Sequence, residues 1–343
     1  MKFARAATIG AALAVALACT FSSAALAREF RPIEVEAEPF ANFAVAGDES
    51  SFGELEFRGG VVLSSRDKDF GALSGIALRP DGKSLVAVAD TGFWFTGTLI
   101  ETDGRLTGLA DAAIAPILDA KGKERRGKRF ADAEALQLTT ENGAETAIVA
   151  FERSNEVSRF DARDLADAAA KPITIPATAR ALKANHGLET VAIAPASSPL
   201  DGATVLAEES ALGKDASQRA WIVGGPKAGA FSIRNIGGFA ITDGDFLPNG
   251  DLVILERLFD PGKGLWTRIR RIAAADIAPG KAVDGQVVMT AGLDRHRIDN
   301  MEGIALRSEP DGETSVFIVS DDNQSFLQQT MILKFAWPAA KTQ

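Results

Sequence analysis

The feature of this sequence that most limits its fold is an internal repeat that occurs five times. Each copy has an acid or serine, an alternating apolar segment, a turn, and a second apolar segment that ends in acids. The copies start 60, 55, 54 and 59 residues apart, at Ser74, Glu134, Glu189, Asp243 and Glu302. This period is too long for helical solenoids and is typical of a propeller blade of four antiparallel strands.

Turn signals and the lack of helical periodicity support this interpretation. Residues 80–82, 248–250 and 310–312 read Pro-Asp-Gly or Pro-Asn-Gly, which favour tight turns between strands. We therefore predict an all-β fold, a β-propeller with five readable blade repeats and five or six blades. The fifth repeat ends one strand short. We expect residues 54–63, an N-terminal strand, to close the ring and so remove two open sheet edges.

The first 27 residues are typical of a secretory signal peptide. Two basic residues precede an Ala-rich apolar run, and small residues stand at positions 25 and 27, where a signal peptidase reads them. We expect residues 1–27 to be removed, residues 28–50 to form an extended lead-in and residues 51–340 to form the propeller domain. Lipidation of Cys19, the single cysteine, is the alternative, but the sequence before it fits that signal less well. The mature protein is then periplasmic or secreted.

Composition excludes some classes of partner. Without the two basic residues of the leader, 35 Lys and Arg remain against 46 Asp and Glu, a formal charge of −11. This balance argues against nucleic acid, whose binding depends on many Lys and Arg contacts to phosphates. No later apolar run reaches the roughly 18 residues that a membrane helix needs, so we expect no membrane anchor. We expect a monomeric globular protein that binds an anionic or ester small molecule.

Sheet geometry predicts that many acids meet at one mouth of the central channel. Antiparallel neighbours run in opposite directions, so the start of a first strand and the end of the second share one edge of a blade. Crowded carboxylates repel unless a cation lies among them, and Ca²⁺ takes about six to eight oxygen ligands. The alternative for any single acid is that it accepts backbone hydrogen bonds at a turn. The candidate Ca²⁺ ligands are Glu134, Glu189, Glu302, Asp321, Asp322, Asp90 and Glu152.

Two arginines and a basic run are candidates for binding an anion. Arg153 and Arg257 each follow the acid that ends a second strand. An arginine there can hold a phosphate or carboxylate bidentately, or it can pair with an acid of the neighbouring blade. Residues 121–129 carry six Lys or Arg and lead into the strand of Glu134. This run either forms a solvated loop or attracts an anionic substrate to the mouth.

The two histidines of the chain precede first strands. His186 lies three residues before Glu189, and His296 lies six residues before Glu302. Either is a candidate general base or metal ligand, although a histidine in a loop commonly has neither role. We take His186, with the two arginines, as the candidate catalytic group. The sequence has no Gly-x-Ser-x-Gly or His-Glu-x-x-His motif, which argues against a serine hydrolase and a zinc enzyme.

The repeats resemble a known family, the phytase-like propellers with "esterase-like activity of phytase". The matching stretches are Gly-Ala-Leu-Ser-Gly-Ile at 71–76, Asp-Ala-Glu-Ala-Leu at 132–136, Phe-Glu-Arg at 151–153, Asn-His-Gly-Leu-Glu at 185–189, Asn-Met-Glu-Gly-Ile-Ala at 300–305 and Val-Ser-Asp-Asp-Asn at 319–323. The resemblance covers nearly the whole mature chain. The second repeat departs from it, with Asp-Ala-Glu-Ala where Asp-Pro-Glu-Gly is typical, and the fourth repeat lacks the Glu-Gly pair.

The resemblance implies a β-propeller, export, and Ca²⁺-dependent hydrolysis of a phosphate or carboxylic ester. Because one fold hosts many functions, two further functions stay open. One is a non-catalytic exported propeller that binds a ligand or protein at the same face. The other is a metal-dependent lactonase that uses the same acids on a cyclic ester.

Overall fold

The computed structural model describes residues 28–141, 143–183, 186–209, 217–262 and 264–339. The regular secondary structure of these residues is almost entirely β-strand, with two one-turn helices, α1 (Lys128–Ala131) and α2 (Ala177–Arg180). In the described part of the chain, no helix is long and apolar enough to cross a membrane. The predicted signal peptide, residues 1–27, lies outside the described residues.

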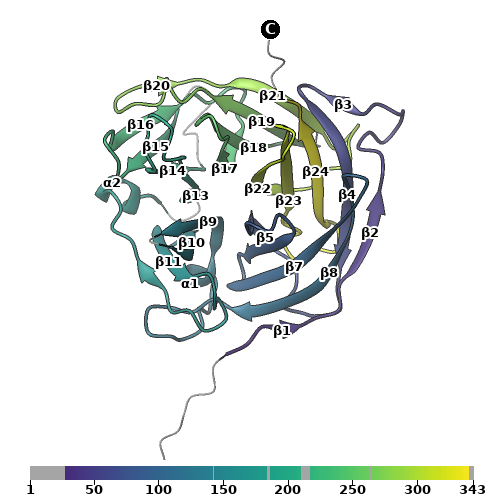
Figure 1. Ribbon diagram of the computed structural model, residues 1–343, viewed down its shortest axis with the longest axis horizontal. Coiled ribbons are helices and arrows are strands. Elements are labelled where there is room, and N and C mark those ends of the chain that lie inside the picture. Colours follow the sequence, from purple (N-terminus) through teal and green to yellow (C-terminus); the bar gives the residue numbers. More distant parts are fainter. Residues whose placement is uncertain (1–27, 142, 184–185, 210–216, 263, 340–343) are drawn as a thin grey trace, which may run out of the picture.

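Five sheets stand around a central axis, so the protein is a five-bladed β-propeller (Figure 1). Blade 1 contains β5 (Leu73–Leu78), β6 (Ser84–Ala89), β7 (Phe93–Thr102) and β8 (Arg105–Pro116). Blade 2 contains β9 (Ala133–Glu141), β10 (Ala144–Phe151), β11 (Glu156–Asp161) and β12 (Lys171–Pro172). Blade 3 contains β13 (Leu188–Ile193), β14 (Thr204–Glu208), β15 (Gln218–Val223) and β16 (Gly229–Ile233). Blade 4 contains β17 (Ala240–Phe246), β18 (Leu252–Asp260), β19 (Gly264–Ile272) and β21 (Gln286–Gly292).

Blade 5 combines strands from both ends of the chain. It contains β22 (Met301–Ser308), β23 (Thr314–Ser320), β24 (Thr330–Trp337) and the N-terminal strand β4 (Leu55–Ser64), which pairs antiparallel with β24. Three short strands add to the blade margins: β1 (Arg31–Pro32) pairs with β8, β2 (Glu36–Phe40) and β3 (Ser51–Phe52) pair with β4, and β20 (Ala282–Val283) pairs with β16. The lead-in is therefore extended chain along the outer edges of blades 1 and 5.

Five apolar cores lie between neighbouring blades, and they explain the apolar runs of the repeats. Each second strand is buried on both faces, as in β6, where Val86, Ala87 and Val88 are fully buried. One face of β6 packs towards blade 5 through Ala87, and the other packs towards blade 2 through Val86 and Val88. Continuous apolar runs of this kind are expected for a strand with no solvent-exposed face.

Each first strand carries a β-bulge at the same point, where one residue has no partner on the second strand. The bulged residues are Ser74, Glu134, Glu189, Thr242 and Glu302. The repeat predicts Asp243 as the fourth member, and the structure corrects this to Thr242. Asp243 is instead opposite Leu255, and its Oδ2 accepts a hydrogen bond from Ile304 N of blade 5 at 2.9 Å. A bulge redirects its side chain, so the same position in every blade points differently from its strand neighbours.

The first strands approach closely around the axis. A Cβ on Gly303 would lie 2.5 Å from Ser74 O, and a Cβ on Gly75 would lie 2.7 Å from Leu136 N. Real Cβ contacts are not that short, so these positions require glycine. In blades 1 and 5, the residue after the bulge is therefore restricted to glycine by the close approach of the neighbouring first strands.

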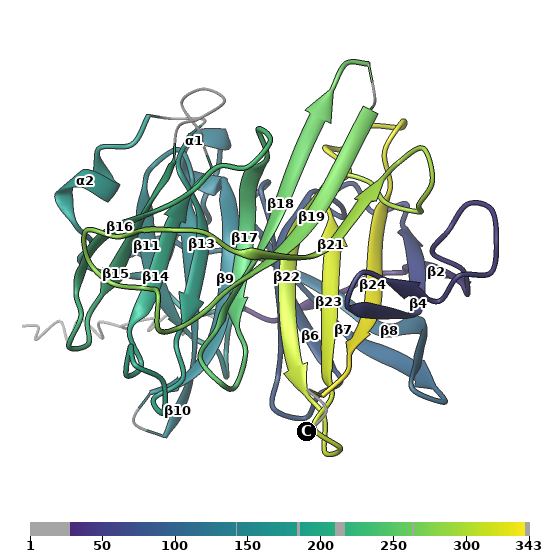
Figure 2. The same ribbon diagram turned by 90° about the horizontal axis from the view of Figure 1, so that it is seen from above.

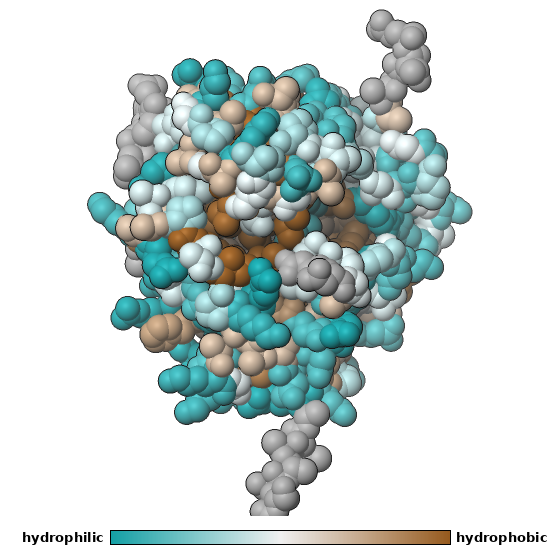
Figure 3. Space-filling model, turned by 60° about the vertical axis from the view of Figure 1, so that its left-hand side comes forward, coloured by the Kyte–Doolittle hydropathy of each residue, from teal (hydrophilic) through white to brown (hydrophobic). Residues whose placement is uncertain are grey.

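The two faces of the disc differ in shape and surface. Seen edge-on, α1, α2 and the long β18–β19 hairpin lie on the same side (Figure 2). This side is the mouth face, where first strands begin and second strands end. Figure 3 turns towards the reader the side of the molecule that carries α2 in Figure 1. The perimeter of this view is mainly hydrophilic, and apolar residues gather in a hollow near its centre.

Candidate metal centre

The acids at the mouth form two connected groups that share Glu152. One group is Asp132, Glu134 and Glu152, and the other is Glu152, Glu189 and Glu209. In each group, one carboxylate oxygen per residue lies within 4.8 Å of the others. Glu134 and Glu189 are bulged residues of first strands, whereas Glu152 and Glu209 directly follow second strands β10 and β14. The two groups therefore span blades 2 and 3.

Burial and mutual repulsion disfavour the ionised form of these acids. Burial raises the pKa of Glu134 and of Glu189 well above the usual value, and neighbouring carboxylates raise both further. Glu134 keeps part of its surface exposed at the mouth, although protein groups surround its carboxyl. Burial also raises the pKa of Asp132 to about 6, and it raises the pKa values of Glu152 and Glu209. A bound cation would relieve this crowding directly.

One oxygen in the first group has no hydrogen-bond partner. Asp132 is fully buried, and its Oδ1 accepts no hydrogen bond among the described residues. Lys128 Nζ lies 3.8 Å from this oxygen, and Oδ2 accepts a hydrogen bond from Arg153 Nε at 2.7 Å. Buried carboxylate oxygens are normally satisfied, so this oxygen is available to a ligand.

Glu302 and Asp321 lie at the same mouth but in neither group. Glu302 Oε1 accepts a hydrogen bond from Asn300 Nδ2 at 2.7 Å and lies 3.3 Å from Arg257 Nε. Burial raises the pKa of Glu302 to about 8 and that of Asp321 to about 7. These two acids therefore add to the acids at the mouth from blade 5, and their burial disfavours the ionised form.

Asp90 and Asp322, two of the predicted ligands, each have a partner in the fold. Asp90 Oδ2 is 2.8 Å from Lys128 Nζ. Asp322 Oδ1 accepts a hydrogen bond from Ala72 N at 2.9 Å, and its Oδ2 accepts one from Thr330 Oγ1 at 2.8 Å. Asp322 thus joins blade 5 to blade 1, and these contacts occupy both of its oxygens.

The two predicted arginines are already paired with mouth acids. Arg153 binds Asp132 as described, and Arg257 Nη2 donates to Glu209 Oε1 at 3.3 Å while its Nε faces Glu302. Arg257 therefore joins blade 3 to blade 5 across the mouth. Arg257 thus pairs with acids of the neighbouring blades, which is one of the two outcomes that the sequence left open, whereas Arg153 pairs with an acid of its own blade 2.

The histidines have different positions. His186 is exposed at the mouth, and its Nδ1 lies 4.0 Å from Glu209 Oε2. His296 packs against the rings of Phe43 and Phe52, at centroid distances of 5.0 and 5.6 Å. Only His186 is therefore placed beside the acid groups.

The basic run reaches the mouth only at its end. Arg125 is buried against the Phe151 ring and pairs with Glu156. Lys128, at the start of α1, pairs with Asp90 at the mouth. Beside this pair lies a cavity of about 300 Å³, whose lining residues are Asp90, Thr91, Gly127, Lys128, Ala131, Asn323 and Gln324.

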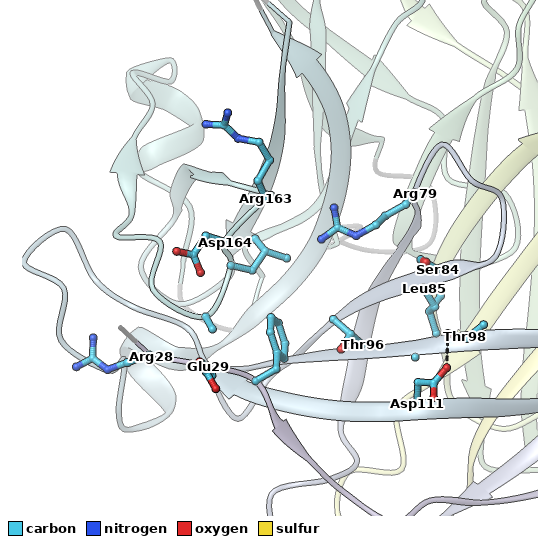
Figure 4. Close-up of a pocket in the computed structure, with 14 residues that line it drawn as sticks. Arg28, Glu29, Arg79, Ser84, Leu85, Thr96, Thr98, Asp111, Arg163 and Asp164 are labelled. Atoms are coloured by element: carbon cyan, nitrogen blue, oxygen red, sulfur yellow. Dashed lines mark hydrogen bonds between the residues drawn. The ribbon is translucent and has the colours of Figure 1, made fainter. Parts of the chain in front are cut away.

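A second cavity, of about 450 Å³, lies between blades 1 and 2 away from the mouth acids (Figure 4). Its arginines have partners: Arg79 binds Glu145, and Arg163 binds Asp161 at 2.6 Å. It therefore offers no convergent acid–base groups of the kind found at the mouth.

Asp132 and Glu209 belong to the two carboxylate groups but are not among the candidate ligands named from the sequence. The sequence signals for Asp132 are its place two residues before Glu134 and its place as the first residue of the Asp-Ala-Glu-Ala stretch that resembles the family. Glu208 is opposite Leu188 in the sheet and binds Arg219 at 2.7 Å, whereas Glu209 is beyond the strand and turns to the mouth.

Comparison with known proteins gives the family. Among solved structures, the chain is similar to the PQQ-bound form of aldose sugar dehydrogenase from Streptomyces coelicolor, with 12% identity and a TM-score of 0.38, over 80% of this chain and 98% of that chain. A search of curated proteins found no match. Residues 68–324 match the family described as "Phytase-like: Esterase-like activity of phytase". Because this match covers most of the chain, the protein belongs to the Phytase-like family.

Proposed function

We propose that this protein is an exported, Ca²⁺-dependent ester hydrolase that acts on a phosphate or carboxylic ester at the mouth. The observation that carries the proposal is the pair of carboxylate groups joined by Glu152, each with three oxygens within 4.8 Å. Membership of the Phytase-like family, described by esterase-like activity, supports the same class of reaction.

The donor set fits a hard divalent cation. Ca²⁺ prefers carboxylate oxygens and tolerates irregular geometry, and the residues that would hold it are Asp132, Glu134, Glu152, Glu189 and Glu209. The buried Asp132 Oδ1 without a hydrogen-bond partner supports this fit. When bound, such an ion polarises an ester oxygen and favours ionisation of a water molecule.

The remaining groups position charge and protons. Arg257 holds Glu209 and Glu302 in place through its guanidinium, and Arg153 does the same for Asp132. His186, exposed and 4.0 Å from Glu209, can take a proton from water at its ring nitrogen and return it to solvent. In this proposal, residues of blades 2 and 3 hold the cation, and His186 carries the proton at the entrance to the mouth.

The second candidate function is a non-catalytic propeller that binds a ligand at the same face. It is favoured by the pairing of Lys128, Arg153 and Arg257 with mouth acids, which is what a purely structural network shows. A lactonase reaction remains within the first proposal, because a lactone is a cyclic carboxylic ester.

A hydrolysis screen of the mature chain, residues 28–343, separates these functions. The screen compares phosphate monoesters, carboxylic esters and lactones, each with Ca²⁺ and with a chelator. We expect turnover that requires Ca²⁺ and is lost in Glu152→Gln, with Glu208→Gln as the matched control because Glu208 faces Arg219. Absence of turnover in all classes, with Ca²⁺ binding intact, would favour the binding function.

A further inference from the structure

The connection between β23 and β24 holds two apolar side chains outside the fold. Phe326 and Leu327 are 96% and 78% exposed. The backbone around them is braced, because Gln328 Nε2 donates to Asp299 Oδ1 at 3.2 Å and Gln329 N donates to Asp299 Oδ2 at 3.0 Å. Phe326 and Leu327 are therefore held at the tip of a supported connection on the mouth side and do not fold back onto the core.

A third apolar side chain lies on a neighbouring connection. Phe130 of α1 is 53% exposed. The cavity of about 300 Å³ beside the mouth is lined by residues of the α1 segment and by Asn323 and Gln324 of the β23–β24 connection. None of the three exposed apolar side chains lines this cavity, so they project from the two connections that border it.

Exposed cations accompany these apolar side chains. The α1 segment and the adjoining β4–β5 connection carry Arg126, Lys128, Arg129, Arg66 and Lys68, all exposed. Lys68 and Arg126 line the same cavity of about 450 Å³, so the two connections adjoin, and one exposed acid, Glu29 of the lead-in, lines it too. Three of the cations pair with half-buried acids, but their side chains remain more than half exposed. We call these five cations with Phe130, Phe326 and Leu327 the basic–apolar patch.

Blade 4 adds apolar side chains on the same side of the disc. Phe259, near the tip of the β18–β19 hairpin, is 67% exposed, and Leu293, directly after β21, is also exposed. Phe259 is opposite Leu265 in the sheet, and Leu293 N donates to Leu265 O at 2.9 Å. Figure 2 shows this hairpin projecting from the mouth face. Exposed apolar side chains therefore stand at the mouth ends of blades 4 and 5 and on α1.

The far face has the opposite character. Among the described residues, its turns carry none of the exposed large apolar side chains. The exposed charges of these turns are mainly acidic, with Lys83, Arg163 and Lys281 against Asp81, Asp103, Asp164, Asp167, Asp201, Asp276, Asp284 and Asp311. The negative charge of the chain is therefore not spread evenly over its surface, and the basic–apolar patch stands apart from it.

Projecting aromatic and leucine side chains among exposed cations match an anionic lipid surface. Lys and Arg contact the lipid phosphates, while apolar side chains enter the boundary between headgroups and acyl chains. A soluble anion would leave the apolar side chains in water. A second copy of this chain also fits less well, because the turns of its far face offer acids without exposed large apolar side chains.

We propose that the mouth face docks on an anionic phospholipid surface through the basic–apolar patch. Docking of this kind needs no membrane-spanning helix. It is independent of the hydrolase proposed above, because it uses exposed connections and none of the carboxylate groups. The mouth acids, such as Glu152, Glu189 and Asp321, are buried, so the exposed cations of the patch meet the lipid headgroups first.

The first test is sedimentation with lipid vesicles in the presence of a chelator, which prevents bridging by Ca²⁺. Residues 28–343, which contain all five blades, are mixed with vesicles of phosphatidylcholine alone or with about one third phosphatidylglycerol. We expect the anionic vesicles to bind at least about tenfold more tightly, because charge and apolar contacts then both contribute. Equal binding to both kinds of vesicle, or no binding to either, would overturn the proposal.

Two double variants test the two parts of the patch. Phe326→Ser/Leu327→Ser removes apolar contacts and Arg126→Glu/Arg129→Glu reverses two charges, and each should weaken binding to anionic vesicles by about tenfold or more. The matched controls, Val287→Ser and Lys83→Glu/Lys281→Glu, change exposed side chains at or near the far face and should leave binding unchanged. Melting temperatures check that each variant is folded. Full binding by both mouth variants contradicts docking through the patch.

Fluorescence separates lipid docking from the alternatives. Relative to the wild type, Phe326→Trp should add emission that shifts to shorter wavelength on anionic vesicles and is quenched by lipids brominated in the acyl chain. Ile100→Trp, near the far end of β7, should show neither effect. Binding that the charge variant removes and the apolar variant leaves intact would assign the patch to soluble anions and overturn the proposal. Self-association without vesicles that Phe326→Ser/Leu327→Ser abolishes would overturn it in favour of a second copy.

Discussion

Adjacent acids at the ends of the second strands have different surroundings, although the sequence presents them as pairs. Glu208 binds Arg219, whereas Glu209 faces Glu152 and Glu189. Successive side chains of extended chain point to opposite sides, so one member of each pair turns to the mouth and the other turns away. The same reason separates Asp321 from Asp322, whose oxygens are used between blades.

At the residue scale, Glu152→Gln tests whether Glu152, which belongs to both carboxylate groups, contributes to Ca²⁺ binding. Saturating Ca²⁺ stabilises a binding protein by RT ln(1 + [L]/Kd), about 2.7 kcal/mol at a hundredfold excess over Kd. We expect the wild type to show this rise in melting temperature and Glu152→Gln to lose most of it, since both groups lose an oxygen donor and charge.

The control for this prediction is Glu302→Gln. Glu302 was predicted as a ligand, but it lies outside both groups and faces Arg257. Its substitution should reduce the calcium response only slightly. Equal calcium responses of Glu152→Gln and wild type would contradict a site centred on Glu152.

At the scale of the element, strand registers decide which side chains reach the mouth. The repeat indicates the start of each first strand to within one residue, and only the sheet shows the bulge at Thr242 instead of Asp243. A bulge depends on hydrogen bonding to the neighbouring strand, which is tertiary information. Glu256 shows the same limit, because it lies in a rim position by sequence but is fully buried between Arg268 and Arg270.

The buried Glu256 cluster of β18 and β19 gives a stability prediction. Glu256 Oε2 accepts from Arg268 Nε at 2.7 Å, and Arg270 Nη2 donates to Oε1 at 2.7 Å. Glu256→Ala leaves two buried guanidiniums without their carboxylate, so we expect a loss of about 3–5 kcal/mol in the free energy of unfolding.

Urea denaturation would measure this loss. Asp161→Ala is the matched control, because Asp161 also pairs with an arginine, Arg163, but at the surface. The control should cost less than about 1 kcal/mol. A similarly small loss in the free energy of unfolding for Glu256→Ala would show that the Glu256 cluster does not stabilise blade 4.

At the scale of the whole molecule, the closed ring brings acids from blades 2, 3 and 5 to one mouth, and this predicts a pH dependence. Burial raises the pKa of Glu302 to about 8 and that of Asp321 to about 7. A group whose pKa is raised on folding gives its full stabilisation below the unfolded pKa, and this is lost as pH rises through the folded pKa. Without metal, stability should therefore fall between about pH 4 and pH 8.

Melting temperatures across this range, with a chelator and with Ca²⁺, would check the prediction. Ca²⁺ should reduce the fall, because the cation compensates the carboxylates that ionise. A metal-free protein whose melting temperature rises from pH 5 to pH 8 would show that the mouth acids are ionised in the fold without a cation.

The sequence by itself determined the all-β class, the five blades as repeats, and the gathering of acids at one face, because alternation and antiparallel direction are local properties. It also indicated the strand near residues 54–63 that pairs with β24. Only the tertiary structure decided that Glu152 joins two groups, that Asp132 belongs to one of them, and that Arg153 and Arg257 are already paired. These contacts cross from one blade or loop to another, and their distances depend on how tightly the ring packs around its axis.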